Sequence, residues 1–356
     1  MELFISCDWG TSNFRLRVVD RDNYQVLAEE RSDLGIATVF EQWRQTNREE
    51  EARLPFYQAI LLEQIQRLSP RSGHSPESLS LKGLPLVISG MASSSLGMIE
   101  LPYKELPVNI SGQELHKVIL PATDRFPHAM LIVSGVRTDD DVMRGEETQL
   151  IGCLLEGRAD QGAVRLAQND EGIYLFPGTH SKHIRVKEDK IVGFTTYMTG
   201  EFFHLLSQKS ILAGSVTAPG ISPERSGASG KVSGIAREPS GNSRENDYRK
   251  SFEKGVEDSV KTGLLHGSFL VRTHHLFGRW SREENYNYLS GLLIGEELKD
   301  LVKAGLPVTI VGSEQQKYYY GLACDLLNIT VAGCPDADQA LVKGHVKLYS
   351  LCQSEI

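Results

Sequence analysis

The sequence lacks the short motifs of several common enzyme classes. The patterns GxxxxGK[ST], GxGxxG, HExxH and GxSxG do not occur in its 356 residues, which excludes P-loop, Rossmann, zincin and hydrolase sites in their usual forms. Cysteines are also few, since the five present show neither the pairing of a zinc site nor the density of a secreted disulfide framework. We therefore expect reduced thiols in a cytoplasmic protein.

Positive charge and long apolar runs are scarce as well. The chain has 38 lysines and arginines against 46 acidic residues, a formal net charge of −8, so we expect neither nucleic acid nor a membrane as a partner. No segment approaches the roughly 20 apolar residues that span a bilayer, and no basic leader precedes a long apolar run. A small-molecule substrate fits this composition, and a homodimer is compatible with it.

The residues that are present suit an α/β enzyme of two domains. The length is too great for one compact core, and strand and helix patterns alternate along the second half. We place the domains at 1–165 and 166–356. The predicted strands are Leu3–Cys7, Phe14–Val19, Tyr24–Glu30, Leu84–Ser89, Met130–Val133, a hairpin over Gly172–Lys187, Val308–Val311 and Thr330–Val331. The predicted helices lie in Asn47–Leu68, Glu146–Leu155, Tyr248–Leu276, Arg282–Ala304 and Gln315–Leu327. A stretch rich in glycine, serine and proline, Ser215–Asn246, is predicted to be a mobile surface loop.

A turn between the first two predicted strands carries residues typical of an anion site. They are Asp8, Gly10, Thr11, Ser12, Asn13 and Arg15. The glycine lets the backbone approach a ligand, exposed N–H groups attract anions, and the two hydroxyls add donors. Asp8 is placed to hold Mg²⁺ through water, and Arg15 offers a positive charge to phosphates. An ordinary hairpin stabilised by its aspartate and threonine is the alternative.

A second glycine-threonine turn lies inside the predicted hairpin of the second half. Its candidate phosphate-binding residues are Gly178, Thr179, His180, Ser181 and Lys182. A third glycine turn, Gly312–Ser313, follows a strand and precedes a helix, where a backbone can lie against a nucleoside. Taken alone, this third turn favours a plain strand-to-helix connection.

These three turns, in this order, resemble the phosphate-1, phosphate-2 and adenosine motifs of the actin, sugar kinase and Hsp70 superfamily. The segments DWGTSNFRLRV, VMRGEETQLIG, FPGTHSKHIRV, MTGEFFHLL and SGLLIGEEL are similar to those of the 2-dehydro-3-deoxygalactonokinase (2-keto-3-deoxy-galactonate kinase) family. The resemblance implies a two-domain actin-like ATPase (ribonuclease H-like) fold with a cleft between the domains. It places the first phosphate loop and the sugar site in the first domain, and the second phosphate loop and the adenosine site in the second. It also implies transfer of a phosphate from ATP, with Mg²⁺, to the 6-hydroxyl of 2-dehydro-3-deoxy-D-galactonate in galactonate catabolism.

Phosphoryl transfer needs a base for the attacking hydroxyl as well as positioning and charge neutralisation. Acidic residues cluster at 139–147, where a helix is predicted to begin. By comparison with the Gly-Asp pair of more distant sugar kinases, Glu146 corresponds to the base, with Asp141 in reserve. Both acids could equally be favourable charges at a helix start.

The carboxylate of the implied substrate calls for an arginine, which binds it with two donors. Arg144 is the first choice and Arg137 the second, although a surface ion pair is the commoner fate of an arginine. A loop of small residues after a predicted strand is assigned to the sugar hydroxyls, with a plain flexible loop as the alternative. Its residues are Ser89, Gly90, Met91, Ser93 and Ser94.

Three other functions fit the same motifs. One is a kinase of this fold acting on another sugar or keto sugar acid. Another is a sensor that closes on ATP and a sugar acid without transferring phosphate, which the acids at 139–147 argue against. The third is an ATPase or phosphatase with water as the acceptor. A panel of substrates in a coupled ADP-release assay separates the first from the leading hypothesis, and the dependence of ADP release on a sugar separates the other two.

Overall fold

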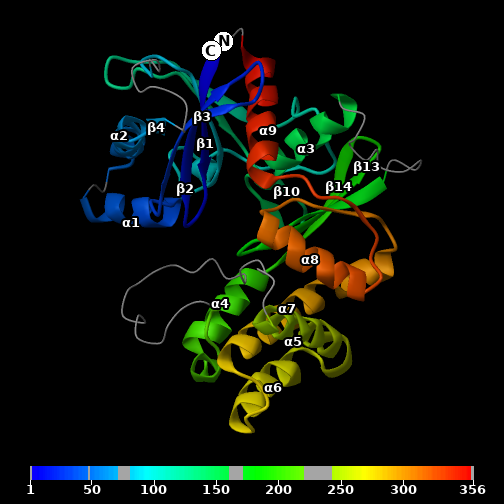
Figure 1. Cartoon of the computed structure of the whole chain (residues 1–356). Coiled ribbons are helices and arrows are strands. Elements are labelled where there is room, and N and C mark those ends of the chain that lie inside the picture. Colours follow the sequence, from blue (N-terminus) through cyan, green and yellow to red (C-terminus); the bar gives the residue numbers. More distant parts are fainter. Residues whose placement is uncertain (1, 47–48, 71–80, 160–170, 220–242, 354–356) are drawn as a thin grey trace. The chain divides into compact units, whose positions relative to one another are not determined.

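The computed structural model describes residues 2–46, 49–70, 81–159, 171–219 and 243–353 (Figure 1). The chain divides into two compact units. Unit 1 comprises Met1–Ala163, Lys187–Phe194 and Ala337–Ile356, and unit 2 comprises Val164–Val186 and Thr195–Asp336. The predicted division at 165/166 differs from this one mainly at the C-terminus, because the final helix packs within unit 1. Within the described ranges, no helix has the length and apolar character needed to cross a bilayer.

Unit 1 is built on a seven-stranded sheet with the order β4-β3-β2-β1-β5-β9-β8. Its strands are β1 (Leu3–Trp9), β2 (Phe14–Asp20), β3 (Val26–Ser32), β4 (Ser69–Pro70), β5 (Leu86–Gly90), β8 (Lys117–Leu120) and β9 (Met130–Val133). β1, β2 and β3 form an antiparallel meander, whereas β5 runs parallel to β1 and β9 parallel to β5. The predicted opening meander and the next two strands are confirmed, each within a few residues of its expected ends.

Side chains alternate between the two faces of this sheet. Ile5, Cys7 and Trp9 of β1 face one apolar core with α1 (Ile36–Thr46) and α2 (Arg53–Gln66). Helix α1 was not predicted, and the helix expected over Asn47–Leu68 is a 3-10 turn, η1 (Glu50–Ala52), followed by α2. The intervening Ser6 and Asp8 lie on the opposite face, which α9 contacts.

The backbones of two helices of unit 1 pack directly against each other. They are α3 (Glu146–Ala159), which was predicted, and α9 (Ala337–Cys352), which was not. A methyl group on Gly152 would collide with the carbonyl oxygen of Ala340, and one on Gly344 with that of Thr148. The glycines therefore let the two backbones touch, and Figure 1 shows α9, in red, beside α3. Three short strands, β6 (Lys104–Glu105), β10 (Val136–Arg137) and β11 (Val142–Met143), form a separate small sheet.

The second large sheet repeats the strand order of the first when it is read from its opposite end: a meander of three strands is followed by two further strands parallel to the first strand of the meander. Its order is β16-β15-β12-β13-β14-β7, with β7 (Val108–Asn109), β12 (Glu171–Phe176), β13 (Ser181–Lys187), β14 (Lys190–Tyr197), β15 (Val308–Ile310) and β16 (Val331–Gly333). β13 and β14 are joined by Glu188 and Asp189, both at positive φ, which is the tight turn of an antiparallel hairpin. β15 runs parallel to β12, and β16 parallel to β15. The predicted hairpin over Gly172–Lys187 is confirmed as β12–β13.

The helices of unit 2 enclose an apolar core with this sheet. They are α4 (Thr199–Lys209), α5 (Ser243–Thr262), α6 (Leu264–Leu276), α7 (Arg282–Ala304) and α8 (Glu314–Leu326), with the 3-10 turn η4 (Ile211–Ser215). Helix α7 has the predicted bounds because a Ser281–Glu284 capping box begins it and Gly305, at φ 62°, ends it. The helix predicted over Tyr248–Leu276 is broken into two at Gly263, whose φ is 70°.

The predicted mobile loop, Ser215–Asn246, falls mostly outside the described residues. Its last four residues, 243–246, are not loop but the first turn of α5. Their polar composition masked this start, because the apolar residues that hold α5 in the core, such as Phe252 and Val256, come later.

Candidate functional site

The carboxyl ends of β1 and β5 meet the start of α3 in unit 1. Asp8 pairs with Ser89 and Trp9 with Gly90 across the two strands. A methyl group on Gly90 would lie 2.8 Å from the Trp9 carbonyl oxygen and 3.6 Å from Oδ1 of Asp8. One on Gly145 would lie 3.5 Å from Cα of Gly90. Both glycines have positive φ, 86° and 110°, so these backbones approach in a way that larger residues would prevent.

The turn after β1 is held by backbone bonds, and its side chains stay exposed. The N–H of Gly10 donates to the carbonyl of Asn13 at 2.9 Å. The first two amides of α1 donate to the carbonyls of Gly10 and Thr11 at 2.9 and 3.1 Å. Thr11, Ser12 and Asn13 are exposed. Helix α1 thus fixes the turn and leaves two hydroxyls and an amide open to a ligand.

Arg15 is bound between two carboxylates. Its Nη1 lies 3.7 Å from Oδ2 of Asp8 and 3.0 Å from Oδ1 of Asp338, at the start of α9. Asp338 also contacts Arg17 at 2.8 Å and Arg31 at 3.0 Å. Burial raises the pKa of Asp338, but Arg17, Arg15 and Arg31 together bring it below its usual value. Asp338 is therefore anionic at neutral pH and holds Arg15 beside Asp8.

Burial raises the pKa of Asp8, although Arg15 and Arg17 oppose the shift. The side chain of Asp8 is 24% exposed, so one edge of the carboxylate remains open. A partly open carboxylate suits a magnesium ion, which keeps several of its waters and binds through one or two carboxylates.

The predicted sugar loop has much of its hydroxyl content engaged by protein groups. Ser89 is buried and its Oγ lies 2.9 Å from Nε2 of His345, whose Nδ1 lies 2.7 Å from Oγ of Ser6. Burial lowers the pKa of His345 to about 3, with a smaller effect of Arg17, so the imidazole is neutral. Ser94 Oγ donates to the carbonyl of Met91 at 2.7 Å, within the turn that follows η3 (Met91–Ser93). The loop is thus a structured turn, not a flexible one.

Arg144, the first of the two predicted carboxylate ligands, is held by three neighbouring groups. Its Nη1 donates to Oγ of Ser93 at 2.7 Å, its Nη2 donates to the carbonyl of Leu101 at 2.9 Å, and its guanidinium lies 3.9 Å from the centroid of the Tyr103 ring. Across the described ranges, no acidic side chain forms an ion pair with Arg144. Its charge therefore remains available to a ligand.

Arg137, in contrast, is exposed and pairs with Glu105 on the neighbouring strand. Its positive charge is already met, so the geometry gives it no preference for a substrate carboxylate. The signal that separates the two arginines is long-range contact, which the local sequence does not show.

The start of α3 carries two adjacent glutamates in different environments. Glu146 is half-buried and directly follows Gly145. Glu147 is 1% exposed, and both of its carboxyl oxygens accept from the N–H of Gly145, at 3.0 and 2.8 Å. Burial, and then the nearby Glu146, raise the pKa of Glu147 to about 8. Glu147 is thus mainly protonated at neutral pH.

The reserve candidate, Asp141, lies in the turn between β10 and β11. Its Oδ1 accepts from the N–H of Val142 at 2.7 Å, and its own N–H donates to Oγ1 of Thr138 at 2.9 Å. These bonds stabilise the turn. Glu146, in contrast, directly follows Gly145, the glycine that lies beside Gly90. In sequence it is therefore nearer than Asp141 to this meeting point at the ends of β1 and β5.

In unit 2, the β12–β13 turn is packed against the start of α4. A methyl group on Gly200 would lie 2.5 Å from the carbonyl oxygen of Gly178 and 2.8 Å from Cα of Thr179. The N–H of Glu201 donates to the carbonyl of Thr179 at 3.0 Å, and its carboxylate lies 2.5 Å from Nε2 of His180. The turn is therefore held firmly while Thr179 and His180 remain exposed.

The Gly312–Ser313 turn meets the same hairpin. Ser313 caps α8, and its capping partner is Gln316. Gln316 Nε2 donates to the carbonyl of Pro177 at 2.7 Å. The predicted second phosphate turn and the predicted adenosine turn are thus joined through one glutamine.

A buried polar network connects the β12–β13 hairpin to α7 and α8. The N–H of Gly178 donates to Oγ of Ser181 at 3.3 Å, and this Oγ lies 3.2 Å from the hydroxyl of Tyr320. Tyr320 in turn donates to Glu297 at 2.8 Å, and Glu297 lies 2.9 Å from Nε2 of His183. Sequence reasoning missed Glu297 and Tyr320. An acid within the apolar stripe of SGLLIGEEL was the available signal.

Lys182 is buried at the base of the same hairpin, with 6% of its surface exposed. In the part of the chain that the structure describes, no carboxylate forms an ion pair with its amine. A buried lysine without a counter-charge is costly unless an anion completes the site.

The strand order that the two large sheets share, with a glycine turn after the first strand of each, is that of the actin-like ATPase fold, which includes sugar kinases. The chain belongs to the 2-keto-3-deoxy-galactonokinase family, whose family model matches residues 8–348. This confirms the family expected from the sequence motifs.

Relatives of the chain carry the same description. A protein of Rhizobium meliloti (strain 1021) described as a probable 2-dehydro-3-deoxygalactonokinase is 29% identical over 348 residues, or 96% of this chain and 94% of that protein. The 2-dehydro-3-deoxygalactonokinase of Escherichia coli (strain K12) is 31% identical over 257 residues, or 68% of this chain and 72% of that one. A crystal structure described under the same name, from Sinorhizobium meliloti, matches with a TM-score of 0.70 and 27% identity, covering 99% of this chain and 96% of that chain.

Proposed function

We propose that this protein transfers the terminal phosphate of ATP to the 6-hydroxyl of 2-dehydro-3-deoxy-D-galactonate, in the cytoplasmic catabolism of galactonate. The match to the family over residues 8–348 supports the reaction. The observation that carries the assignment of the site is the meeting of Asp8, Gly90 and the Gly145–Glu146 helix start in unit 1. A homodimer is compatible with this proposal, and sedimentation would measure it.

Glu146 is assigned as the base that accepts the proton of the attacking hydroxyl. Its neighbour Glu147 has a pKa of about 8 and is mainly neutral at pH 7. Glu147 already carries its proton and cannot accept another, so Glu146 is left as the candidate base. Glu147 instead holds the Gly145 N–H, and this fixes the start of the helix from which Glu146 projects.

Both glycine-threonine turns are assigned to the phosphates. In unit 1, the exposed hydroxyls of Thr11 and Ser12 and the side chain of Asn13 offer donors to an anion. In unit 2, Thr179 and the buried Lys182 offer a hydroxyl and a positive charge. Gly312 and Ser313 are assigned to the adenosine, because their contact with the hairpin through Gln316 places them beside the second phosphate turn.

The residues of unit 1 fit a magnesium ion. Among the described residues, no group of three or more His, Cys, Asp or Glu side chains is gathered as a metal site, and magnesium does not require one, since it keeps several waters and binds phosphate oxygens. Asp8, partly open and fixed by Arg15, would hold the ion. When bound, magnesium would neutralise charge on the transferred phosphate.

Arg144 is assigned to the carboxylate of the sugar acid, and the turn after β5 to its hydroxyls. The stacking of Arg144 on Tyr103 and its bonds to Ser93 and Leu101 leave it fixed before substrate arrives. A fixed guanidinium loses less entropy on binding than a mobile one.

The test is a coupled assay of ADP release with wild type and with Glu146→Gln, over a panel of sugar acids. Release that depends on 2-dehydro-3-deoxy-D-galactonate, and a fall in turnover of about a hundredfold or more in the variant with unchanged ATP affinity, would support the proposal. Preference for another acid would assign a different substrate to the same fold. Binding without release would indicate a sensor, and release without any sugar an ATPase. Wild-type turnover in the variant would remove Glu146 as the base.

A further inference from the structure

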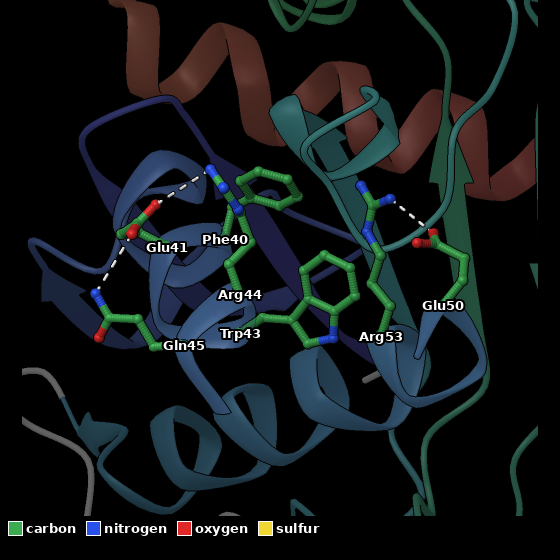
Figure 2. Close-up of a pocket in the computed structure, with 7 residues that line it drawn as sticks. All are labelled: Phe40, Glu41, Trp43, Arg44, Gln45, Glu50 and Arg53. Atoms are coloured by element: carbon green, nitrogen blue, oxygen red, sulfur yellow. Dashed lines mark hydrogen bonds and ion pairs between the residues drawn. The ribbon is translucent and has the colours of Figure 1, made fainter. Parts of the chain in front are cut away.

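A pocket of about 500 Å³ lies between α1 and α2 of unit 1 (Figure 2). Its lining residues are Phe40, Glu41, Trp43, Arg44, Gln45, Glu50 and Arg53. Figure 2 shows the Trp43 ring between Arg44 and Arg53. The guanidinium of Arg53 lies 5.5 Å from the centroid of the Phe40 ring and 5.4 Å from that of Trp43. The aromatic rings thus hold Arg53 from one side.

From its other side, Arg53 reaches a loop that follows β5. Its Nε donates to the carbonyl of Gly97 at 2.7 Å, and its Nη2 donates to the carbonyl of Ser95. One turn further along α2, the hydroxyl of Tyr57 donates to the carbonyl of Leu96 at 2.5 Å. Two side chains of one helix face therefore bind three consecutive carbonyls.

These bonds are shielded from water, and a donor or acceptor left unpaired in such a place would be costly. Arg53 is 9% exposed and Tyr57 is 0% exposed. The charge of Arg53 is met by Glu50, whose Oε1 lies 2.8 Å from Nη1. The guanidinium therefore uses three separate donors in one plane, an arrangement that a lysine cannot reproduce.

The bound carbonyls belong to a compact segment, and two other groups of the same segment bind Arg144. The N–H of Met98 donates to the carbonyl of Ala92 at 2.8 Å, and that of Leu101 to the carbonyl of Ser93 at 3.0 Å. A methyl group on Gly97 would collide with the Ala92 carbonyl, so the turn closes tightly. Ser93 Oγ and the Leu101 carbonyl are the two acceptors of Arg144.

We propose that Arg53 and Tyr57, the α2 clamp, are positioning residues that fix residues 93–101 and thereby aim Arg144 at the carboxylate of the sugar acid. This role rests on the proposed function of Arg144. The clamp itself touches no reacting atom. It acts because both acceptors of Arg144 lie in the segment whose carbonyls at residues 95, 96 and 97 it holds.

The test compares Tyr57→Phe and Arg53→Lys with wild type. The matched control is Tyr288→Phe, which removes the same hydroxyl from another fully buried tyrosine, bonded to Asp258 at 3.1 Å in unit 2. We expect each clamp variant to raise the KM for the sugar acid about fivefold, the effect of about one lost hydrogen bond, while kcat and the KM for ATP change less than twofold. The control should lower the melting temperature and leave both KM values unchanged.

Three results would overturn the clamp. They are an unchanged KM for the sugar acid despite a lower melting temperature, an equal rise in both KM values, or the same KM change in the control. If Arg53→Lys does not fold, Tyr57→Phe decides the question alone.

Amide hydrogen exchange separates failure of the clamp from failure of the proposed function. If wild type shows no activity with the sugar acid, the proposed function fails, and exchange still tests the clamp. Faster exchange of the amides of Gly97, Met98 and Leu101 in Tyr57→Phe, but not in Tyr288→Phe, supports positioning of the segment. Equal exchange in all three proteins overturns it.

Discussion

Glu147 should give the stability of unit 1 a pH dependence that a single substitution removes. Its pKa is about 8 in the folded chain against an ordinary value of 4.5, so the native state binds this proton more tightly than the unfolded state does. Below pH 4.5 both states are protonated and the contribution to stability is complete. It is lost as the pH rises toward 8, because the unfolded chain gives up the proton first.

The size of this effect follows from one proton. The slope is at most about 1.4 kcal/mol per pH unit inside the window, and burial at 1% exposure leaves little screening by water. Glu147→Gln cannot ionise, and its amide oxygen can still accept from the Gly145 N–H. The stability of wild type relative to this variant should therefore fall by about 1 kcal/mol per pH unit between pH 5.5 and 7.5 and level off above about pH 8.

Urea denaturation at half-unit steps from pH 5 to 9 measures this difference, with reversibility and the denaturant slope checked at each pH. Relative to wild type, the variant gains stability toward alkaline pH. Parallel curves for the two proteins across the whole range would refute the reasoning, because they would show that Glu147 does not bind its proton differently in the two states.

Three further substitutions test other contacts. Arg144→Lys should raise the KM for the sugar acid about tenfold or more, since a lysine cannot supply the planar fork of donors. The control Arg137→Lys should change this KM less than twofold, and equal effects would contradict the choice of Arg144. Gly152→Ala should destabilise unit 1 by about 3 kcal/mol or more in urea denaturation, because its methyl group would strike the backbone of α9, while Gly321→Ala, which meets nothing within 4 Å, should be neutral or stabilising; similar losses would contradict the close packing. Tyr320→Phe should raise the KM for ATP about fivefold and spare that for the sugar acid, because it breaks the support of the β12–β13 turn; an unaltered KM for ATP would separate that network from nucleotide binding.

The parts of the fold that were predictable are those coded by neighbouring residues. The opening meander follows from alternating apolar side chains and turn residues, and α7 from its own capping box and terminal glycine. Helix α1 was missed because Ile36, Thr38 and Val39 favour a strand locally, yet Ile36, Val39 and Trp43 bury one helical face in the core. In α9, Gly344 weakens the helical signal, and its purpose is contact with a helix far away in the chain.

The candidate site likewise has features that the local sequence predicts and features that it does not. Glycine turns such as 10–13 and 177–180 are local, so their existence could be predicted. The fates of individual polar side chains depend on partners that no local pattern reveals. Arg15 lies 323 residues from its partner Asp338, and Ser89 lies 256 residues from His345. The assignments of these residues to ligands therefore remain predictions, now with defined protein contacts.

The return of α9 to unit 1 has a consequence for biosynthesis. Strands β1 to β9 leave the ribosome early, but the helix that covers Ser6 and Ser89 is translated only after all of unit 2. Until then, a sheet face that carries Phe4 as well as Ser6 and Ser89, and the glycine surface of α3, stay uncovered on the nascent chain. Unit 2 can complete its own core first, so the order of maturation is the reverse of the order of translation. Chaperone demand should accordingly fall on the N-terminal half during that delay.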